Sequence, residues 1–175
     1  MKSWFLDQNS NHQEANMAKK VVIIGGVAAG ASAAARLRRL DENAQIIMVE
    51  RGEYISFANC GLPYYVGGVI KKRERLLIQT PRSMFKRFNI DVRNLSEVEQ
   101  IKPQDKEIII RNLADGEVYS ESYDYLIMSP GASPIIPNIP GVQQANVFTV
   151  RNVPDSDRIK QYIDVAEPQI GRAHV

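Results

Sequence analysis

The feature that most limits the possible folds is a strand, a glycine-rich turn, a helix and a second strand between residues 20 and 50. Residues 20–25, KVVIIG, form a continuous β-branched run of the kind buried on both faces in a parallel sheet. Helix formers follow over residues 30–41, and residues 44–50, AQIIMVE, give a second apolar strand. Two strands joined in this way make a βαβ unit with a right-handed crossover. The sequence therefore predicts an α/β fold built on a parallel sheet.

The turn inside this unit reads GGVAAG, an imperfect version of the pattern G-x-G-x-x-G. Its first and last glycines allow a tight turn and close packing of the helix on the strand, whereas Val27 stands where the middle glycine usually stands. The small residues before the last glycine leave room for a pyrophosphate at the helix N-terminus. The residues that we expect to bind a dinucleotide are Gly25, Gly26, Val27, Ala28, Ala29 and Gly30.

An acidic residue strengthens this interpretation. Glu50 ends the second predicted strand, 20 residues after Gly30, about where a carboxylate binds the ribose hydroxyls of an adenosine. We include Arg51 beside it in the expected cofactor site. The alternative is a glycine-rich turn that binds nothing, with Glu50 as a solvated strand end.

The only cysteine, Cys60, lies in ISFANCGLPYY, residues 55–65. Segments that leave the carboxyl ends of the strands lie on the ligand-binding side of an open α/β sheet, so we expect Cys60 beside the dinucleotide site. Pro63 suits the first turn of a short helix that Gly67 would end. A thiol near a helix N-terminus is richer in the reactive thiolate. The alternative is a buried, inert cysteine.

Composition narrows the choice of partners and compartment. The 22 basic and 20 acidic residues leave a net charge of +2, which gives no support to a nucleic acid or an anionic membrane as partner. A single cysteine cannot form an internal disulfide, so we expect a cytoplasmic protein. Residues 1–17 lack the apolar run of a signal peptide, and we expect a disordered extension there. Residues 170–175 continue no amphipathic pattern and are expected to be a non-native tail, with a short native tail as the alternative.

Over residues 18–169 the sequence resembles the single-cysteine flavoprotein branch of the pyridine nucleotide-disulfide oxidoreductases, and within it the coenzyme A-disulfide reductases. The most specific stretch, residues 56–64, resembles the signature S-F-x-x-C-x-x-x-Y. Residues 21–41, 123–134 and 148–159 are similar to family segments in the same order. The resemblance implies a Rossmann-like FAD-binding domain with a parallel sheet, crossover helices and a β-meander.

The resemblance also implies an activity. NAD(P)H would reduce the flavin, which would deliver electrons to Cys60, and Cys60 would cycle through a mixed disulfide with coenzyme A. Tyr65 stands where two-cysteine relatives keep their second cysteine, so an external thiol or persulfide must supply the second sulfur. Gly131, in the loop of residues 129–141, would approach the flavin. The residues implied to contact coenzyme A are Ser32, Arg36, Arg39, Ser56 and Asn59. For each arginine alone, a solvated helix face remains an equal alternative.

Two other functions stay open. Peroxidase and oxidase branches of the family typically carry a histidine in the glycine loop, where this chain has Ala28, which favours disulfide or persulfide reduction over NADH oxidation. The second alternative is a flavin- or nucleotide-binding module without turnover. Because the sequence contains no second glycine-rich βαβ unit, the NAD(P)H and dimerisation domains of the family are missing. We therefore expect an N-terminal fragment of a homodimeric enzyme, inactive alone.

The rest of the chain gives structural expectations. The charge run of residues 71–75, KKRER, is interpreted as a solvated face, with a role near an anionic ligand as the alternative. Residues 80–89 predict a helix capped by Thr80, and residues 154–168 a further helix. Strands are expected around an Asp115-Gly116 turn and over residues 125–128. The side chains of the first of these helices that we expect in the core are Met84, Phe85 and Phe88.

Overall fold

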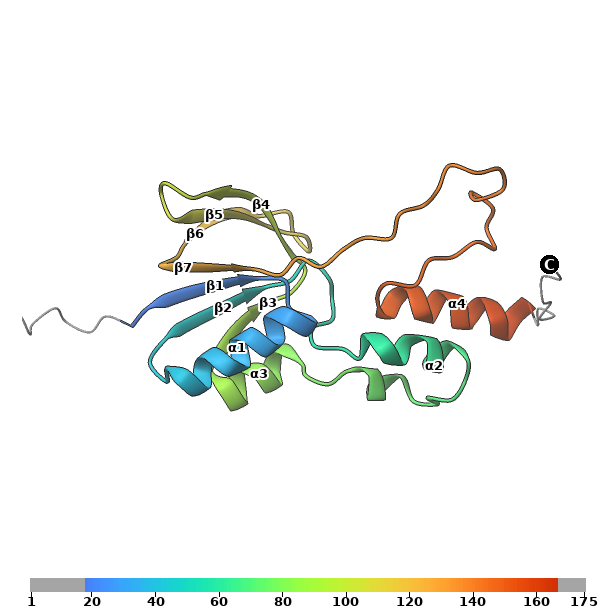
Figure 1. Cartoon of the computed structure of the whole chain (residues 1–175), viewed down its shortest axis with the longest axis horizontal. Coiled ribbons are helices and arrows are strands. Elements are labelled where there is room, and N and C mark those ends of the chain that lie inside the picture. The colour runs from blue at the N-terminus through green and yellow to red at the C-terminus, as the bar shows by residue number, and fades with distance from the viewer. Residues whose placement is uncertain (1–17, 167–175) are drawn as a thin grey trace, which may run out of the picture.

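The computed structural model describes residues 18–166, so the extension expected over residues 1–17 and the tail expected over residues 170–175 lie outside the described chain. Four parallel strands form the central sheet in the order β3-β2-β1-β7 (Figure 1). The βαβ unit predicted from the sequence is confirmed by the pairing of Lys20–Ile24 with Gln45–Val49. The bounds of the strands are β1 Lys20–Ile24, β2 Gln45–Val49, β3 Ile90–Arg93 and β7 Tyr125–Met128.

The sheet is the middle of three layers. Helices α1 (Ala28–Leu40) and α3 (Pro81–Phe88) cover one face, and an antiparallel meander covers the other. The meander consists of β4 (Ser96–Lys102), β5 (Glu107–Asn112) and β6 (Val118–Ser122). The expected Rossmann-like architecture with a β-meander is thereby confirmed.

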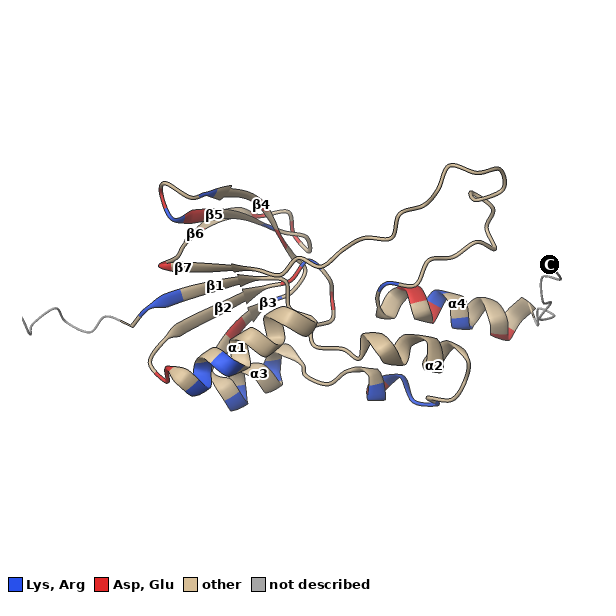
Figure 2. Ribbon diagram, in the orientation of Figure 1, with Lys and Arg blue, Asp and Glu red and all other residues tan. Residues whose placement is uncertain are grey.

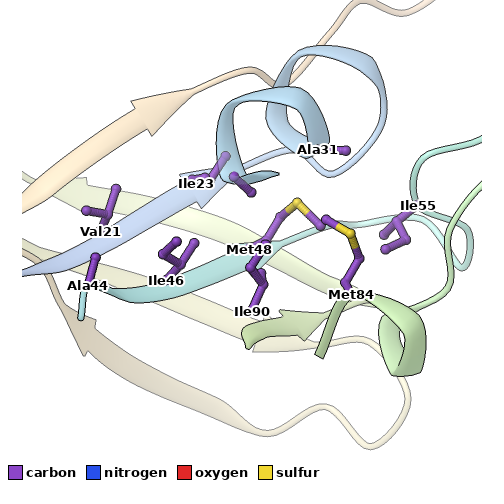
Figure 3. Close-up of a cluster of buried hydrophobic side chains, with 10 residues drawn as sticks. Val21, Ile23, Ala31, Ala44, Ile46, Met48, Ile55, Met84 and Ile90 are labelled. Atoms are coloured by element: carbon purple, nitrogen blue, oxygen red, sulfur yellow. The ribbon is translucent and has the colours of Figure 1, made fainter. Parts of the chain in front are cut away.

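Alternation along the strands decides which layer each side chain joins. Successive residues of a strand point to opposite faces of the sheet. Ile23 and Met48 pack with Ala31 and Met84 under the helices (Figure 3), whereas Val22, on the opposite face of β1, packs in the cluster of the meander. The continuous apolar strands of the sequence are therefore explained by burial on both faces. The members of the meander-side cluster are Val22, Ile47, Val49, Ile108 and Ile110.

A smaller unit extends beyond the carboxyl ends of the strands. It contains two short turns, residues 59–61 and 73–76, helix α2 (Leu62–Val66) and helix α4 (Val153–Ala166) (Figure 1). A separate apolar cluster holds it together, consisting of Phe57, Leu62, Tyr65, Leu76 and Val153. No helix within residues 18–166 is long and apolar enough to cross a membrane.

Helix α3 confirms one local prediction and corrects another. Thr80 caps it, because its Oγ1 accepts the Ser83 amide at 3.2 Å while Ser83 Oγ accepts the Thr80 amide at 2.8 Å. Met84 is buried and Phe88 packs against the same cluster, as expected. The expectation for Phe85 was wrong, since its side chain is 61% exposed. One residue along a helix turns by about 100°, so Phe85 cannot share the face of Met84.

A charged cluster ties the meander to the central sheet. The Glu121 carboxylate of β6 receives Lys20 Nζ of β1 at 2.7 Å and a guanidinium nitrogen of Arg93 of β3 at 2.8 Å. Arg93 also pairs with Asp91 at 2.9 Å. Burial alone would raise the pKa of Glu121, but the hydrogen bonds from Lys20 and Arg93 outweigh it and lower that pKa below its ordinary value of 4.5.

We expect Glu121→Gln to lower the free energy of unfolding at pH 7 by about 2 kcal/mol, because two partly buried cations lose their charged acceptor. A carboxyl with a depressed folded pKa stabilises the fold above its unfolded pKa and loses that contribution as the pH falls. The difference between wild type and variant should therefore shrink as the pH drops below 4.5. Urea unfolding at pH 7 and at pH 3.5 measures both effects.

Glu99→Gln is the matched control on the same meander. Glu99 pairs with Arg111 at 2.6 Å, but both side chains are more exposed than those of Glu121, Lys20 and Arg93. We expect a smaller and nearly pH-independent change. Equal effects of the two substitutions would show that Glu121 does not tie the layers together.

Candidate functional site

The glycine turn is a place where three backbone segments meet. Gly25 has φ +94°, and a Cβ there would lie 2.1 Å from the carbonyl oxygen of Ser129. A Cβ on Gly30 would lie 1.8 Å from the carbonyl oxygen of Gly25. Ser129 Oγ donates to the Ile24 carbonyl at 2.8 Å and fixes this approach. Only glycine fits at both positions, as the sequence pattern predicts.

Helix α1 begins directly at this turn, and its N-terminus lacks the usual cap. Val27 precedes the helix without a side-chain hydrogen bond, and the first turn contains no acidic residue. Helices α3 and α4, by contrast, both have capping boxes; in α4 the Asp155 amide donates to Asn152 Oδ1 at 2.9 Å and Asp155 Oδ2 accepts the Asn152 amide at 3.2 Å. The first amides of α1 are therefore left for an anion such as a pyrophosphate.

A cleft of about 360 Å³ opens in front of this helix end. Val27, Ala28 and Ala29 line it, together with residues 50–54 and 129–133. A second hollow of about 320 Å³ adjoins it at the start of β4, and Glu50, Arg51 and residues 130–133 line both. The cleft is of the size that ligand sites usually have.

Glu50 is fixed in place by the backbone. Its Oε2 accepts the Gly26 amide and its Oε1 accepts the Gly52 amide, both at 2.7 Å. A carboxylate has about four acceptor positions, so two remain for ribose hydroxyls, and this contact stays a prediction. Arg51 lies beside it, largely exposed, and pairs with Glu97 at 3.3 Å.

Cys60 is exposed and lies in the short turn before α2. The predicted short helix is confirmed, with Pro63 in its first turn and Gly67 after its last residue. Ser56, in a left-handed conformation with φ +44°, donates its amide to the Gly26 carbonyl at 2.9 Å. The segment that carries the thiol is thus hydrogen-bonded to the glycine turn, and Asn59, next to Cys60, lines the cleft.

The three expected substrate residues of α1 lie on one exposed face. Ser32, Arg36 and Arg39 are spaced by four and three residues, which places them in one row of the helix. Figure 2 shows Lys and Arg positions on the ribbon toward the end of α1 and on α3. Arg38 has a different task, since its Nε donates to the Phe88 carbonyl at 2.7 Å. None of the three residues of this row lines the cleft, so their role in binding stays a prediction.

Arg151 is a site residue that the sequence patterns did not indicate. It lines the cleft, and its Nε donates to the Ala132 carbonyl at 2.6 Å. Its guanidinium covers Gly131, whose φ is +73° and whose Cβ would lie 2.5 Å from an Arg151 nitrogen. The capped start of α4 follows Arg151 in the sequence, but no local pattern shows that the Arg151 side chain faces a cleft. It adds a cation to the site where an anion is expected.

Comparison with known proteins shows which family has this sequence pattern. The sequence matches the family described as pyridine nucleotide-disulphide oxidoreductase over residues 19–165. The chain belongs to this family. Membership of this oxidoreductase family implies FAD and NAD(P)H as cofactors. The uncapped helix end, the glycine contacts and the cleft fit the dinucleotide.

Individual members of the family are also similar to this chain. The coenzyme A disulfide reductase of Staphylococcus aureus (strain JH9) is 41% identical over 144 residues, which cover 82% of this chain and 32% of that protein. The chain thus spans about a third of the length of the curated relatives it matches. The crystal structure of reduced Bacillus anthracis CoADR-RHD is 62% identical with a TM-score of 0.84, covering 86% of this chain and 27% of that one.

Two more distant structures share the oxidoreductase fold. An NAD-dependent persulfide reductase from A. fulgidus is 36% identical with a TM-score of 0.78, covering 83% of this chain and 27% of that one. The water-forming NADH oxidase from Lactobacillus brevis is 28% identical with a TM-score of 0.79, covering 85% and 33%.

Gly25→Ala tests the close approach at the turn. Gly116 is the matched control, because its φ of +81° is similar but nothing lies within 4 Å of its Cβ position. We expect Gly116→Ala to cost about 1 kcal/mol of stability from the left-handed backbone alone. Gly25→Ala should cost about 3 kcal/mol or more, since Ser129 must also move, and should weaken FAD binding. Thermal unfolding and flavin titration measure these effects, and equal losses would refute the backbone contact.

Proposed function

We propose that this chain is the flavin-binding part of an FAD-dependent NAD(P)H:disulfide oxidoreductase. The substrate would be coenzyme A disulfide or a related low-molecular-weight disulfide or persulfide, and Cys60 would be the redox-active residue. The observation that carries the proposal is the exposed Cys60 on a segment that is hydrogen-bonded to the glycine turn and borders the cleft. The coenzyme A disulfide reductases among the relatives support the choice of substrate.

The chemistry needs one nucleophile that is open to a substrate and close to an electron source. The Cys60 thiolate would attack one sulfur of the disulfide, which forms a mixed disulfide and releases the other half as a thiolate. When bound, FAD supplies the two electrons, taken from NAD(P)H as hydride, that reduce this mixed disulfide to two thiols. The chain's own part is to hold Cys60 beside the cleft and to leave it accessible, because an external sulfur must reach it.

Recognition of coenzyme A would use its phosphates. We propose that Arg36 and Arg39 bind phosphate groups through charge-assisted hydrogen bonds, with Ser32 in the same helical row. Ser56 and Asn59, which precede Cys60 on the same segment, would orient the substrate near the sulfur. The exposed face of α1 supports this assignment, because both guanidinium groups face solvent.

NADH oxidation by oxygen is the second candidate. Its support is the shared fold with the water-forming NADH oxidase. Ala28 argues against NADH oxidation by oxygen, because a methyl group at this position of the glycine loop cannot donate or accept a proton at a sulfenic acid or peroxide. We place the enzyme in the cytoplasm, consistent with its single cysteine, and propose a homodimer for the whole protein.

Cys60→Ser tests the redox role in the protein expressed from its complete reading frame. We expect the variant to retain FAD and to lose disulfide-dependent NAD(P)H consumption by about three orders of magnitude, because a serine hydroxyl is not ionised at neutral pH and forms no disulfide. The measurement is NAD(P)H absorbance with coenzyme A disulfide, beside the flavin spectrum. Undiminished turnover would show that Cys60 is not the redox residue, and oxygen consumption by the wild type without a disulfide would favour the oxidase.

Arg36→Ala with Arg39→Ala tests the phosphate contacts. We expect KM for coenzyme A disulfide to rise about tenfold or more, since two charge-assisted hydrogen bonds are lost. KM for a small disulfide without phosphate groups, such as cystine, should stay unchanged. Arg111→Ala, a substitution on the meander, is the control. Parallel changes for both substrates would show that the two arginines do not recognise coenzyme A.

A further inference from the structure

Arg73, from the charge run of residues 71–75, is not on a solvated face. Its Nε donates to both carboxylate oxygens of Asp157, at 3.0 and 2.8 Å, and an NH2 nitrogen donates to the Tyr54 hydroxyl at 2.8 Å. Its guanidinium also lies 4.8 Å from the centre of the Tyr54 ring. Arg73 and Asp157 are each about one third exposed, at 32% and 31%. The interpretation of the run as a solvated face is confirmed for Lys71, Lys72, Glu74 and Arg75, which are exposed, and Arg73 is the exception.

The surroundings of this pair hold further charged and aromatic groups. Burial, together with the Asp157 carboxylate, raises the pKa of Tyr65. Lys160 Nζ lies 5.8 Å from the centre of the Tyr65 ring. The hydrogen bonds to Asp157 and Tyr54 raise the pKa of Arg73, so its charge is permanent. The pair thus lies at the apolar cluster that joins α2 to α4.

The turn that contains Arg73 is coupled to the segment that carries Cys60. The Ala58 amide donates to the Leu76 carbonyl at 2.8 Å, and the Ile78 amide donates to the Ser56 carbonyl at 3.0 Å. Phe57 and Leu77 form a β-bridge between these two bonds. A shift of residues 73–78 would therefore be transmitted to Cys60.

The partners of Arg73 lie on two segments that both contribute to the cleft. Tyr54 lines the cleft, as do Phe57 and Asn59 nearby in the chain. Asp157 lies one helical turn after Val153, which lines the cleft at the start of α4. Arg73 thereby connects the segment before Cys60 to α4 through side chains 19 and 84 residues away from it.

We propose that the Arg73–Asp157 pair is a positioning element that holds the Cys60 segment at a fixed place relative to the start of α4, which lines the cofactor cleft. The inference rests on the proposed function in taking Cys60 as the redox residue. Arg73 does not touch the reacting sulfur; it acts through Tyr54 and through residues 76–78. A planar guanidinium with two carboxylate bonds and a stacked ring fixes direction as well as distance, which a lysine would not.

The test is the protection of Cys60 by the cofactor, measured in the protein expressed from its complete reading frame. Iodoacetamide alkylates Cys60 in FAD-free and in FAD-loaded protein, and the ratio of the two rates reports how closely the thiol is held against the flavin. We expect FAD to slow alkylation in the wild type and the ratio to fall about threefold or more in Arg73→Ala, as for residues coupled by direct contacts. The value of kcat/KM for the disulfide should fall about tenfold, because the reacting group is misplaced.

Three further variants separate positioning from stability. Asp157→Asn keeps the shape of the side chain and should lower the ratio as Arg73→Ala does, even if Arg73→Ala folds poorly. The exchanged pair Arg73→Asp with Asp157→Arg should recover part of the ratio. Arg111→Ala removes a comparable bidentate pair with Glu99 on the meander and should leave the ratio unchanged.

The outcomes also distinguish this inference from the proposed function. A wild type that shows cofactor protection of Cys60 but reduces no disulfide would refute the function and leave the positioning test intact. A wild type without protection, a ratio in Arg73→Ala and Asp157→Asn equal to that of the wild type, or an equal loss in Arg111→Ala would each overturn the positioning role.

Discussion

The contact between the backbones of Gly25, Gly30 and Ser129 is the constraint on which the rest of the structure depends. It brings the end of β1, the start of α1 and the end of β7 within touching distance. Because no Cβ fits there, the helix begins at the level of the strand ends, and its first amides face the cleft. The same Ser129 lines the cleft and starts the loop that contains Gly131. One backbone contact thus determines both the crossover and the place of the ligand.

Charged residues serve two different purposes in this protein: some stabilise the fold and others are available to a ligand. Lys20 and Arg93 of the central sheet pair with Glu121 of the meander and stabilise the fold. Arg36 and Arg39 have no such task and face solvent on α1. The net charge of +2 does not show this difference, because it counts paired side chains and side chains available to a ligand together. The distinction between paired and exposed cations therefore says more about binding than the total does.

The sequence was sufficient to predict features that depend on residues close together along the chain. The βαβ unit, the glycine turn, the Thr80 cap and the helix at Pro63 all follow from patterns within a few residues. Strands β3 and β4 were not predicted, because each is short or only partly buried, and its place in a sheet depends on distant partners. Arg73 and Arg151 were missed for the same reason: Asp157 lies 84 residues from Arg73, and Ala132 lies 19 residues from Arg151. Phe85 was misplaced because its hydrophobicity was considered without its helical angle.

The uncapped start of α1 has a consequence for stability. Most helices carry their own side-chain cap, so their stability is set once the chain is made. Here the missing cap would be supplied by a small molecule, and the free energy of folding then depends on how much of that molecule is present. A ligand at 100 times its dissociation constant adds about 2.7 kcal/mol to a folded state. The stability of the folded protein would accordingly rise with the concentration of the dinucleotide that binds there.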